Sequence, residues 1–286
     1  MPSLASKSTK DPLKVLCIGD SGSGKSGALG SLILAGYELF ILDFDNGLDV
    51  LRYALKGNTK ALEGVHVELL QDKSVSLPTS NIGMGVPVAG AFTKALQLCN
   101  NWVDSETKQS FGPCTTWDTN KILVVDTLTS MGKAAWNYTM MLNKRVGDHA
   151  RIQDWGDAMN LIEQFLGILC GSATCNIIVN AHIDYQNREG TGITKGLPMT
   201  LGNKLSPKVA GLFNTMLLFK TKGINENAKR YIYTMPDGTT DAKCPILDAP
   251  KELSQVDGLA QIFALWEKGS SQSVSTRPTQ QLGAKQ

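Results

Sequence analysis

The segment Gly19-Asp20-Ser21-Gly22-Ser23-Gly24-Lys25-Ser26 constrains the fold of this chain more than any other feature. It fits the pattern Gly-x-x-x-x-Gly-Lys-Ser/Thr, it follows an apolar run over 15–18, and a helical pattern begins at Gly27. Glycines let a backbone bend so that its N–H groups converge on phosphate oxygens, and the following helix N-terminus adds partial positive charge. We therefore expect residues 19–27 to cradle the phosphates of ATP. In this arrangement Lys25 reaches the β- and γ-phosphates and Ser26 ligates Mg²⁺.

A loop of this kind needs an acidic partner for the metal. The run Lys121-Ile122-Leu123-Val124-Val125-Asp126 places a carboxylate directly after four apolar residues. Ligands of open α/β sheets bind at the carboxyl ends of the strands, so Asp126 is expected to hold Mg²⁺ through water. The alternative is an aspartate that only begins the next turn.

The residue after Asp126 is Thr127, where many ATPases carry a catalytic glutamate, so the general base must lie elsewhere. A second strand-like run over 37–42 ends in the acidic segment Asp43-Phe44-Asp45-Asn46-Gly47-Leu48-Asp49. We expect Asp45 to polarise the attacking water. The alternative is that Asp43 and Asp45 cap the next helix.

Short apolar runs alternate with helical patterns through most of the chain. Strands are expected over 14–18, 37–42, 65–70, 122–125, 175–180, 215–220 and 230–234, and helices over 24–35, 89–102 and 151–169. This alternation predicts an α/β fold with a mostly parallel sheet, helices on both faces, and a late antiparallel β-hairpin. We expect one domain over 14–268, a flexible segment over 1–13 and a disordered tail over 269–286.

The composition is that of an ordinary globular protein: 286 residues, 42% hydrophobic, 19% charged and a formal net charge of +2. No apolar stretch is long enough to span a membrane, and the six cysteines form no CxxC pair or zinc-finger spacing. We therefore expect a reduced, soluble, intracellular protein. The small net charge excludes a uniformly basic nucleic-acid binder. The segment 188–230, however, holds eight basic and two acidic residues.

Taken together, the phosphate loop, the acidic end of the second strand and the segment "ILVVDTLTSM" resemble the core of the RecA recombinases. The chain is most similar to the short RecA-like ATPases of bacteriophages, the Sak-four type of single-strand annealing protein. They share "QDWGDA" ahead of a long helix, a histidine that ends the strand "NIIVNAHI", and a late "TMPDGTTDAKCP" segment. RecA itself has glutamate where this chain has Asp45, and we find no match to the arginine or lysine that RecA-like proteins insert into a neighbouring subunit's site.

The resemblance implies roles for further residues. His182 falls at the position of a γ-phosphate sensor, although a strand-end histidine satisfied by its neighbours is the alternative. A DNA-binding loop is expected after it, with Tyr185 stacking on a base and Arg188, Lys195, Lys204 and Lys208 contacting phosphates. Lys243 is expected near a nucleotide or subunit edge, or else is an ordinary surface lysine.

The function implied is a Mg²⁺-dependent ATPase that assembles as a ring or filament on single-stranded DNA. It would promote annealing or strand exchange in phage recombination, in the cytoplasm of a bacterial host, alongside a phage or host single-strand-binding protein. One alternative is an ATP-gated loader or scaffold for a replication protein, with weak hydrolysis. Another is a small-molecule kinase, which the absence of clustered arginines disfavours. A GTPase is disfavoured further, because the sequence has no Asn-Lys-x-Asp motif to recognise guanine.

Overall fold

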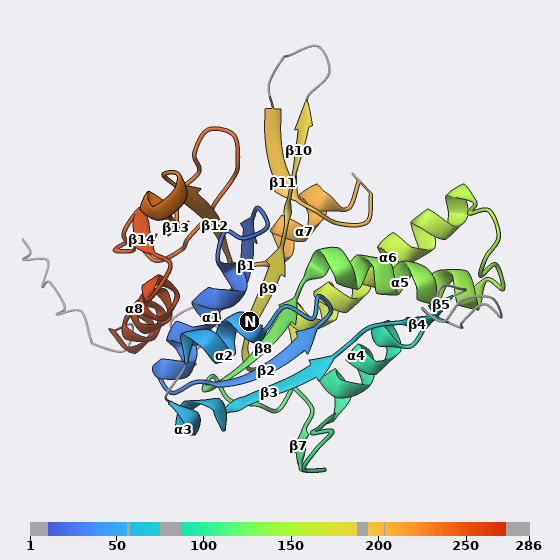
Figure 1. The fold of residues 1–286 in the computed structure, drawn as a ribbon, viewed down its shortest axis with the longest axis horizontal. Coiled ribbons are helices and arrows are strands. Elements are labelled where there is room, and N and C mark those ends of the chain that lie inside the picture. The colour runs from blue at the N-terminus through green and yellow to red at the C-terminus, as the bar shows by residue number, and fades with distance from the viewer. Residues whose placement is uncertain (1–10, 56–57, 75–86, 188–193, 203, 273–286) are drawn as a thin grey trace, which may run out of the picture.

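The protein is described by a computed structural model that covers residues 11–55, 58–74, 87–187, 194–202 and 204–272. Its centre is an eight-stranded sheet (Figure 1). In spatial order the strands are β14 (Glu252–Ser254), β13 (Lys229–Tyr233), β12 (Thr215–Lys222), β1 (Lys14–Gly19), β9 (Asn176–Ala181), β8 (Lys121–Asp126), β2 (Glu38–Asp43) and β3 (Val65–Leu69). The strands from β12 to β3 are parallel, and β13 and β14 add antiparallel pairings at one edge. The expected sheet and late antiparallel hairpin are confirmed.

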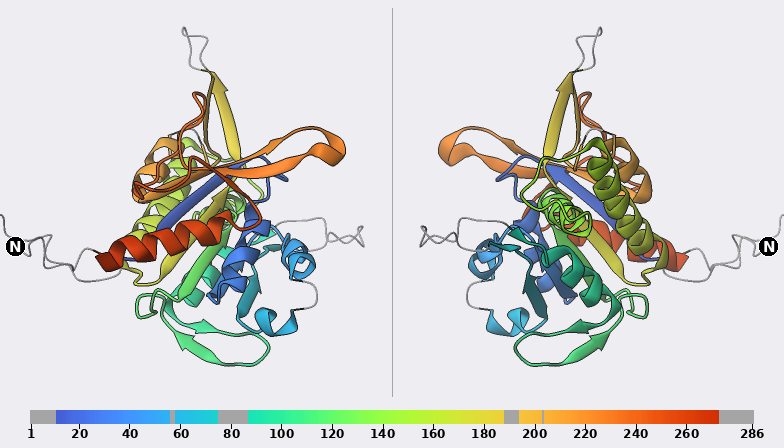
Figure 2. Two further views of the ribbon diagram at one scale, coloured as in Figure 1. Left: turned by 90° about the vertical axis from the view of Figure 1, so that its left-hand side faces the viewer. Right: turned by 90° about the vertical axis from the view of Figure 1, so that its right-hand side faces the viewer.

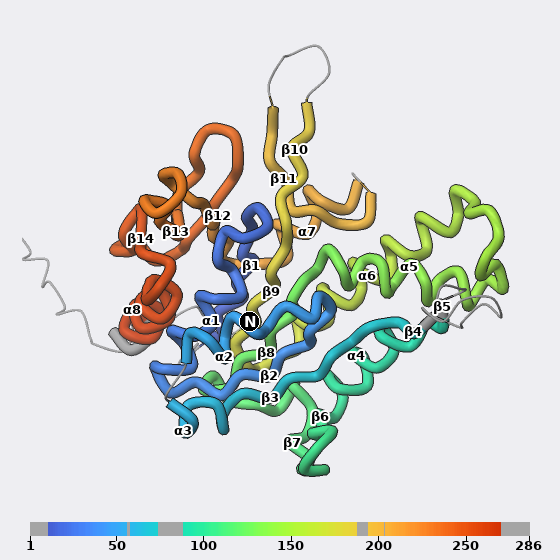
Figure 3. Tube along the Cα trace, viewed as in Figure 1, coloured from blue at the N-terminus to red at the C-terminus, as the bar shows by residue number. Residues whose placement is uncertain are grey.

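Helices cover both faces of the sheet because side chains on both sides of its central strands are apolar. In β1, Val15 and Cys17 belong to one buried cluster and Leu16 and Ile18 to the other. The first face is covered by α1 (Lys25–Leu34), α2 (Asp49–Ala54), α3 (Thr59–Leu62) and α8 (Gly258–Gln272). The second is covered by α4 (Ala91–Asn100), α5 (Leu128–Leu142), α6 (Ile152–Ser172) and α7 (Ser206–Leu212) (Figure 3).

The remaining elements are short and peripheral to the sheet. They are the pairs β4 (Lys73–Ser74) with β5 (Pro87–Val88) and β6 (Trp102–Val103) with β7 (Ser110–Gly112), and the 3-10 helix η2 (Asn225–Asn227). No helix in the described part of the chain is long and apolar enough to cross a membrane.

The segment after His182 differs from the expected loop. It forms two antiparallel strands, β10 (Ile183–Asn187) and β11 (Thr194–Pro198), which project from one end of the molecule (Figures 1 and 2). The sequence did not predict this hairpin because alternation between apolar and polar residues is confined to the first four residues of β10 and is absent from β11.

Two long helices were not predicted from the sequence. Helix α5 begins directly after β8, where the hydroxyl of Thr127 accepts the backbone N–H of Ser130. Helix α8 continues to Gln272, four residues beyond the domain end that we expected at 268. The expected flexible residues 1–10 and the expected tail from 273 lie outside the described residues.

Candidate functional site

The phosphate loop connects the end of β1 to the start of α1, as predicted. Gly22 and Gly24 have φ angles of 77° and 95°, in the left-handed region that L side chains rarely adopt. The turn is closed by a hydrogen bond from the N–H of Ser23 to the carbonyl of Asp20 (3.2 Å). The loop thus has the backbone form that lets successive N–H groups face an anion.

Lys25 is held inside this loop. Its Nζ donates hydrogen bonds to the carbonyl oxygens of Gly19 (2.7 Å) and Asp20 (3.0 Å). Burial lowers the pKa of Lys25, and the nearby carboxylate of Asp126 opposes that shift. A desolvated ammonium group at this position interacts more strongly with a phosphate than a hydrated one would.

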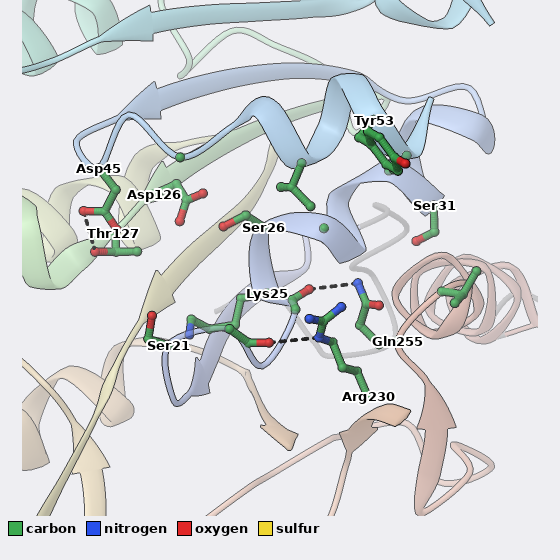
Figure 4. A pocket seen from close by; sticks show the side chains of 18 of the residues that line it. Ser21, Lys25, Ser26, Ser31, Asp45, Tyr53, Asp126, Thr127, Arg230 and Gln255 are labelled. Atoms are coloured by element: carbon green, nitrogen blue, oxygen red, sulfur yellow. Dashed lines mark hydrogen bonds between the residues drawn. The ribbon is translucent and has the colours of Figure 1, made fainter. Parts of the chain in front are cut away.

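Asp126 lies at the carboxyl end of β8, next to the loop (Figure 4). Its side chain is 2% exposed, and burial raises its pKa. The carboxylate accepts a hydrogen bond from Asn180 Nδ2 (3.1 Å), and the nearby Ser26 hydroxyl opposes the rise of its pKa. Hydroxyl and carboxylate oxygens side by side are ligands that suit Mg²⁺. No group of three or more metal-ligating residues occurs in the described ranges, so these two fit an ion whose other ligands are phosphate oxygens and water.

The segments that follow three neighbouring strands meet beside Asp126. Asp45 follows β2, Thr127 follows β8 and His182 follows β9. The Thr127 hydroxyl donates to Asp45 (3.4 Å), and His182 Nε2 lies 3.9 Å from the Asp45 carboxylate. Burial and then the charge of Lys25 lower the pKa of His182, which is therefore neutral at pH 7. The two residues singled out in the sequence as base and sensor are thus neighbours at the same edge of the sheet.

These groups line one cavity of about 500 Å³. Its second half was not predicted and is largely apolar, lined by Leu34, Val50, Tyr53, Leu55 and Val256. The cavity is therefore polar at the end that holds Lys25 and Asp126, and apolar farther along α1.

Arg230 of β13 and Gln255, next to β14, also line the cavity and were missed as site residues. Arg230 Nε donates to the carbonyl of Gly22 and Gln255 Nε2 to that of Gly24, each at 2.9 Å (Figure 4). No local motif marks either residue, because each is more than 200 positions from the loop that it contacts.

Lys243 does not line this cavity. Its backbone forms two hydrogen bonds with Met216, at the start of β12, and among the described residues no hydrogen bond or ion pair joins it to a predicted site residue.

The predicted DNA-contacting residues that the structure describes do not line the cavity. Tyr185 is 47% exposed on β10, and burial, followed by the charge of the nearby Asp20 in the phosphate loop, raises the pKa of its phenol. Lys195 pairs with Asp241 (2.6 Å) and Lys208 with Glu163 (2.8 Å). Lys204 is exposed, and Arg188 lies outside the described residues.

Comparisons with known proteins identify the family. No curated protein matches the sequence. Among solved structures, the chain is similar to a KaiC-like protein from Pyrococcus horikoshii OT3, with 12% identity and a TM-score of 0.40 over 78% of this chain and 79% of the other. It is also similar to the flagellar accessory protein FlaH from Methanocaldococcus jannaschii, with 10% identity and a TM-score of 0.39 over 78% and 77%. A family model described as an AAA domain, AAA_24, matches residues 11–246, and the chain therefore belongs to this family of P-loop ATPase domains.

Proposed function

We propose that the chain is a Mg²⁺-dependent ATPase that acts on single-stranded DNA. The observation that carries the ATPase assignment is the convergence of Lys25, Ser26, Asp126, Asp45 and His182 on one cavity. Lys25 binds the β- and γ-phosphates, and Ser26 and Asp126 hold Mg²⁺, directly and through water. The metal supplies charge neutralisation between the phosphates when it is bound.

Asp45 and His182 are assigned to the γ-phosphate end. The Asp45 carboxylate orients the attacking water and accepts its proton. Thr127 keeps that carboxylate in place through its hydroxyl. His182, neutral and 3.9 Å from Asp45, donates a hydrogen bond to the γ-phosphate and so distinguishes ATP from ADP.

The nucleoside occupies the apolar half of the cavity. The walls there come from α1, from α2 and from the segment after β14. An adenine ring is flat and mostly apolar, and such a surface buries it without requiring many polar partners. Tyr53, which is 79% exposed, offers an aromatic face for stacking.

The DNA-binding surface is the β10–β11 hairpin with the start of α7. The hairpin begins directly after His182, and Tyr185 on it lies near Asp20 of the phosphate loop, whose charge, after burial, raises the pKa of the Tyr185 phenol. Nucleotide state can thereby alter the hairpin at two points. We propose that several copies assemble on a single strand, with Tyr185, Arg188, Lys195, Lys204 and Lys208 toward the DNA, for annealing or exchange in phage recombination.

The deciding experiment measures ATP hydrolysis with and without single-stranded DNA. We expect the wild type to hydrolyse ATP and single-stranded DNA to raise its rate. Lys25→Ala should abolish hydrolysis both with and without DNA. Lys60→Ala, which removes an exposed lysine from α3, is the matched control and should behave as wild type. A wild-type rate that single-stranded DNA leaves unchanged over a range of salt, with no DNA binding, contradicts the DNA assignment and leaves the ATPase assignment standing.

One observation favours a second candidate, an ATP-gated loader. Lys195, Lys208, Lys220 and Lys222 are all paired with carboxylates, which reduces the charge available to DNA. A loader requires ATP-dependent capture of a partner protein, with no stimulation by DNA. Co-sedimentation with purified replication proteins, with ATP or ADP, separates the two functions.

A further inference from the structure

The carbonyl groups on the outer side of the phosphate loop have partners from the far end of the chain. An anion-binding loop turns its N–H groups inward, which leaves its carbonyl oxygens directed outward. The carbonyls of Gly22 and Gly24 accept hydrogen bonds from Arg230 and Gln255, both at 2.9 Å. Gly22 and Gly24 both have left-handed backbones, and the carbonyl of each is thus held from the outer side of the loop by one side chain.

The two side chains form a single unit. The N–H of Gln255 donates to the carbonyl of Arg230 (3.1 Å), so one antiparallel ladder positions both residues. They also pack closely on the loop, since a Cβ atom on Gly24 would lie 2.8 Å from Arg230 Cδ and 2.9 Å from Gln255 Cδ. Arg230 and Gln255, which we call the loop clamp, therefore leave no room for the loop to move toward them.

The guanidinium of Arg230 has hydrogen-bond donors that the phosphate loop does not use. Its Nε is used by Gly22, and within the described ranges the terminal Nη groups of its guanidinium have no hydrogen-bond or ion-pair partner. Arg230 is exposed, and it lines the nucleotide cavity. A guanidinium fixed at one nitrogen, with two others directed to a cavity, is suited to bind a phosphate oxygen.

The position of the loop clamp indicates which phosphates it meets. Asp126, Asp45 and His182 lie on the β9–β8–β2 side of β1, whereas Arg230 and Gln255 come from the opposite side, beyond β12. We propose that Arg230 binds the α- and β-phosphates, and that the loop clamp holds the phosphate loop in its anion-binding form. This proposal rests on the ATP site proposed above. It differs from γ-phosphate recognition because the groups contacted are common to ATP and ADP.

The test compares ATP and ADP dissociation constants, by fluorescence of labelled nucleotides, for four variants. Arg230→Met removes the guanidinium but keeps the apolar stem, and we expect both constants to rise about tenfold or more. Arg230→Lys keeps the positive charge but replaces the fixed, planar guanidinium by a single flexible ammonium group, so both constants should rise less than in Arg230→Met. Gln255→Met, which loses one neutral hydrogen bond, should bind both nucleotides about three- to tenfold more weakly. Lys229→Met, which removes a positive charge from the adjacent position of β13, should change neither constant.

Two further readouts separate this role from a purely structural one. The KM for ATP should rise in Arg230→Met with little change in kcat, because the contact is the same before and after hydrolysis. Its unfolding temperature without nucleotide should stay close to that of the wild type. The proposal is overturned if Arg230→Met binds both nucleotides as the wild type does, or loses ATP alone. The proposal also fails if Arg230→Met loses affinity together with a lower unfolding temperature and Arg230→Lys recovers none of that affinity. Failure of the ATP site itself would appear differently, as a wild type that binds neither nucleotide.

Discussion

At the scale of single residues, the carboxylates of Asp45 and Asp126 follow neighbouring strands but have different surroundings. Asp126 is 2% exposed, accepts a hydrogen bond from Asn180 and lies near the Ser26 hydroxyl, whereas the Asp45 side chain is 28% exposed and faces Thr127 and His182. A buried carboxylate next to a hydroxyl suits a metal ion, and an accessible one suits a water molecule. The two roles can therefore be tested separately.

For the role of Asp45, we predict that Asp45→Asn lowers kcat about 100-fold or more, because an amide cannot accept the proton of the attacking water. The KM for ATP should change less than about threefold, since Lys25 and the loop still bind the phosphates. Asp49→Asn, an exposed carboxylate at the start of α2, is the matched control. Steady-state hydrolysis rates measure both constants. A kcat of Asp45→Asn within a few-fold of the wild-type value would show that Asp45 is not the general base.

For Asp126, we predict that Asp126→Asn stabilises the protein without ligand but prevents its stabilisation by Mg²⁺ and ATP. Because burial raises its pKa above that of an unfolded aspartate, its charged form at pH 7 destabilises the fold. Asp126→Asn should therefore raise the unfolding temperature without nucleotide by about 1–3 °C. It should also abolish the additional stabilisation by ATP that depends on Mg²⁺. Thermal unfolding with and without Mg²⁺ and ATP measures both effects, and a lower unfolding temperature without ligand would contradict the first.

The residues of the site could be predicted only where the chain is locally informative. Gly19 to Ser26 and Asp126 have a fixed spacing and an apolar strand before them, so their positions follow from sequence. Arg230 and Gln255 reach the loop only because β13 and β14 extend the sheet beyond β12. Such a contact depends on strand order, which no local pattern in the sequence determines.

At the scale of elements, the N-terminus of α6 is fixed by one buried carboxylate. Asp154 accepts hydrogen bonds from the backbone N–H of Arg151 (2.8 Å), from Asn143 (2.8 Å) and from the guanidinium of Arg145. These bonds, with that of Arg145 first, lower the pKa of Asp154 to about 2. The network joins α6 to the end of α5, and the two helices pack against each other across the sheet face.

We predict that Asp154→Asn destabilises the protein by several degrees at pH 7, since it removes the charge that Arg145 pairs with. The sign of the pH effect follows from the lowered pKa. The stabilisation by Asp154 is complete above about pH 4 and is lost as the pH falls toward 2. Thermal unfolding between pH 7 and 3 should show a smaller acid-induced loss in the variant than in the wild type. Asp248→Asn, which removes an exposed carboxylate between β13 and β14, is the control. An equal acid-induced loss in Asp154→Asn and in the wild type would contradict the assignment.

Elements were predictable where one physical pattern dominates. The central strands are apolar on both faces and short, and a sheet with helices on both sides is the fold that buries them. The hairpin β10–β11 was missed because only four residues of β10 alternate between apolar and polar and β11 does not alternate, so the pattern typical of a half-buried strand is too short to indicate a pair of strands. Its formation depends on pairing between strands, which the composition of the segment does not reveal.

At the scale of the whole molecule, the distribution of charge differs from that of the sequence. The segment 188–230 has eight basic residues, but four of them are paired in the structure with Asp241, Glu163, Asp237 and Glu252. All four carboxylates lie outside the segment, so the fold brings acidic residues to the basic region. The charge available to a nucleic acid is therefore smaller than the linear sequence indicates.

This arrangement predicts that removing the acidic partners strengthens DNA binding. Lys195 belongs to the β10–β11 hairpin and Lys208 to α7, the surface that we assign to DNA. Glu163→Gln with Asp241→Asn removes the ion pairs that these two carboxylates form with Lys208 and Lys195, while the amides keep similar shape and polarity. Each lysine that then contacts a phosphate releases counterions from single-stranded DNA, and binding becomes both tighter and more dependent on salt.

We expect the double variant to bind single-stranded DNA more tightly at low salt. The slope of log K against log salt should become steeper by about 1.4 if both lysines contact phosphates. Glu63→Gln, an exposed carboxylate just before β3, changes the net charge without affecting this surface and is the control. Fluorescence anisotropy over a range of salt, with ATP and then ADP, gives both slopes. If the double variant and the control match the wild type in affinity and slope, the hairpin and α7 are not the DNA surface. If Glu63→Gln gains as much affinity as the double variant, the tighter binding reflects net charge alone and does not locate the DNA surface.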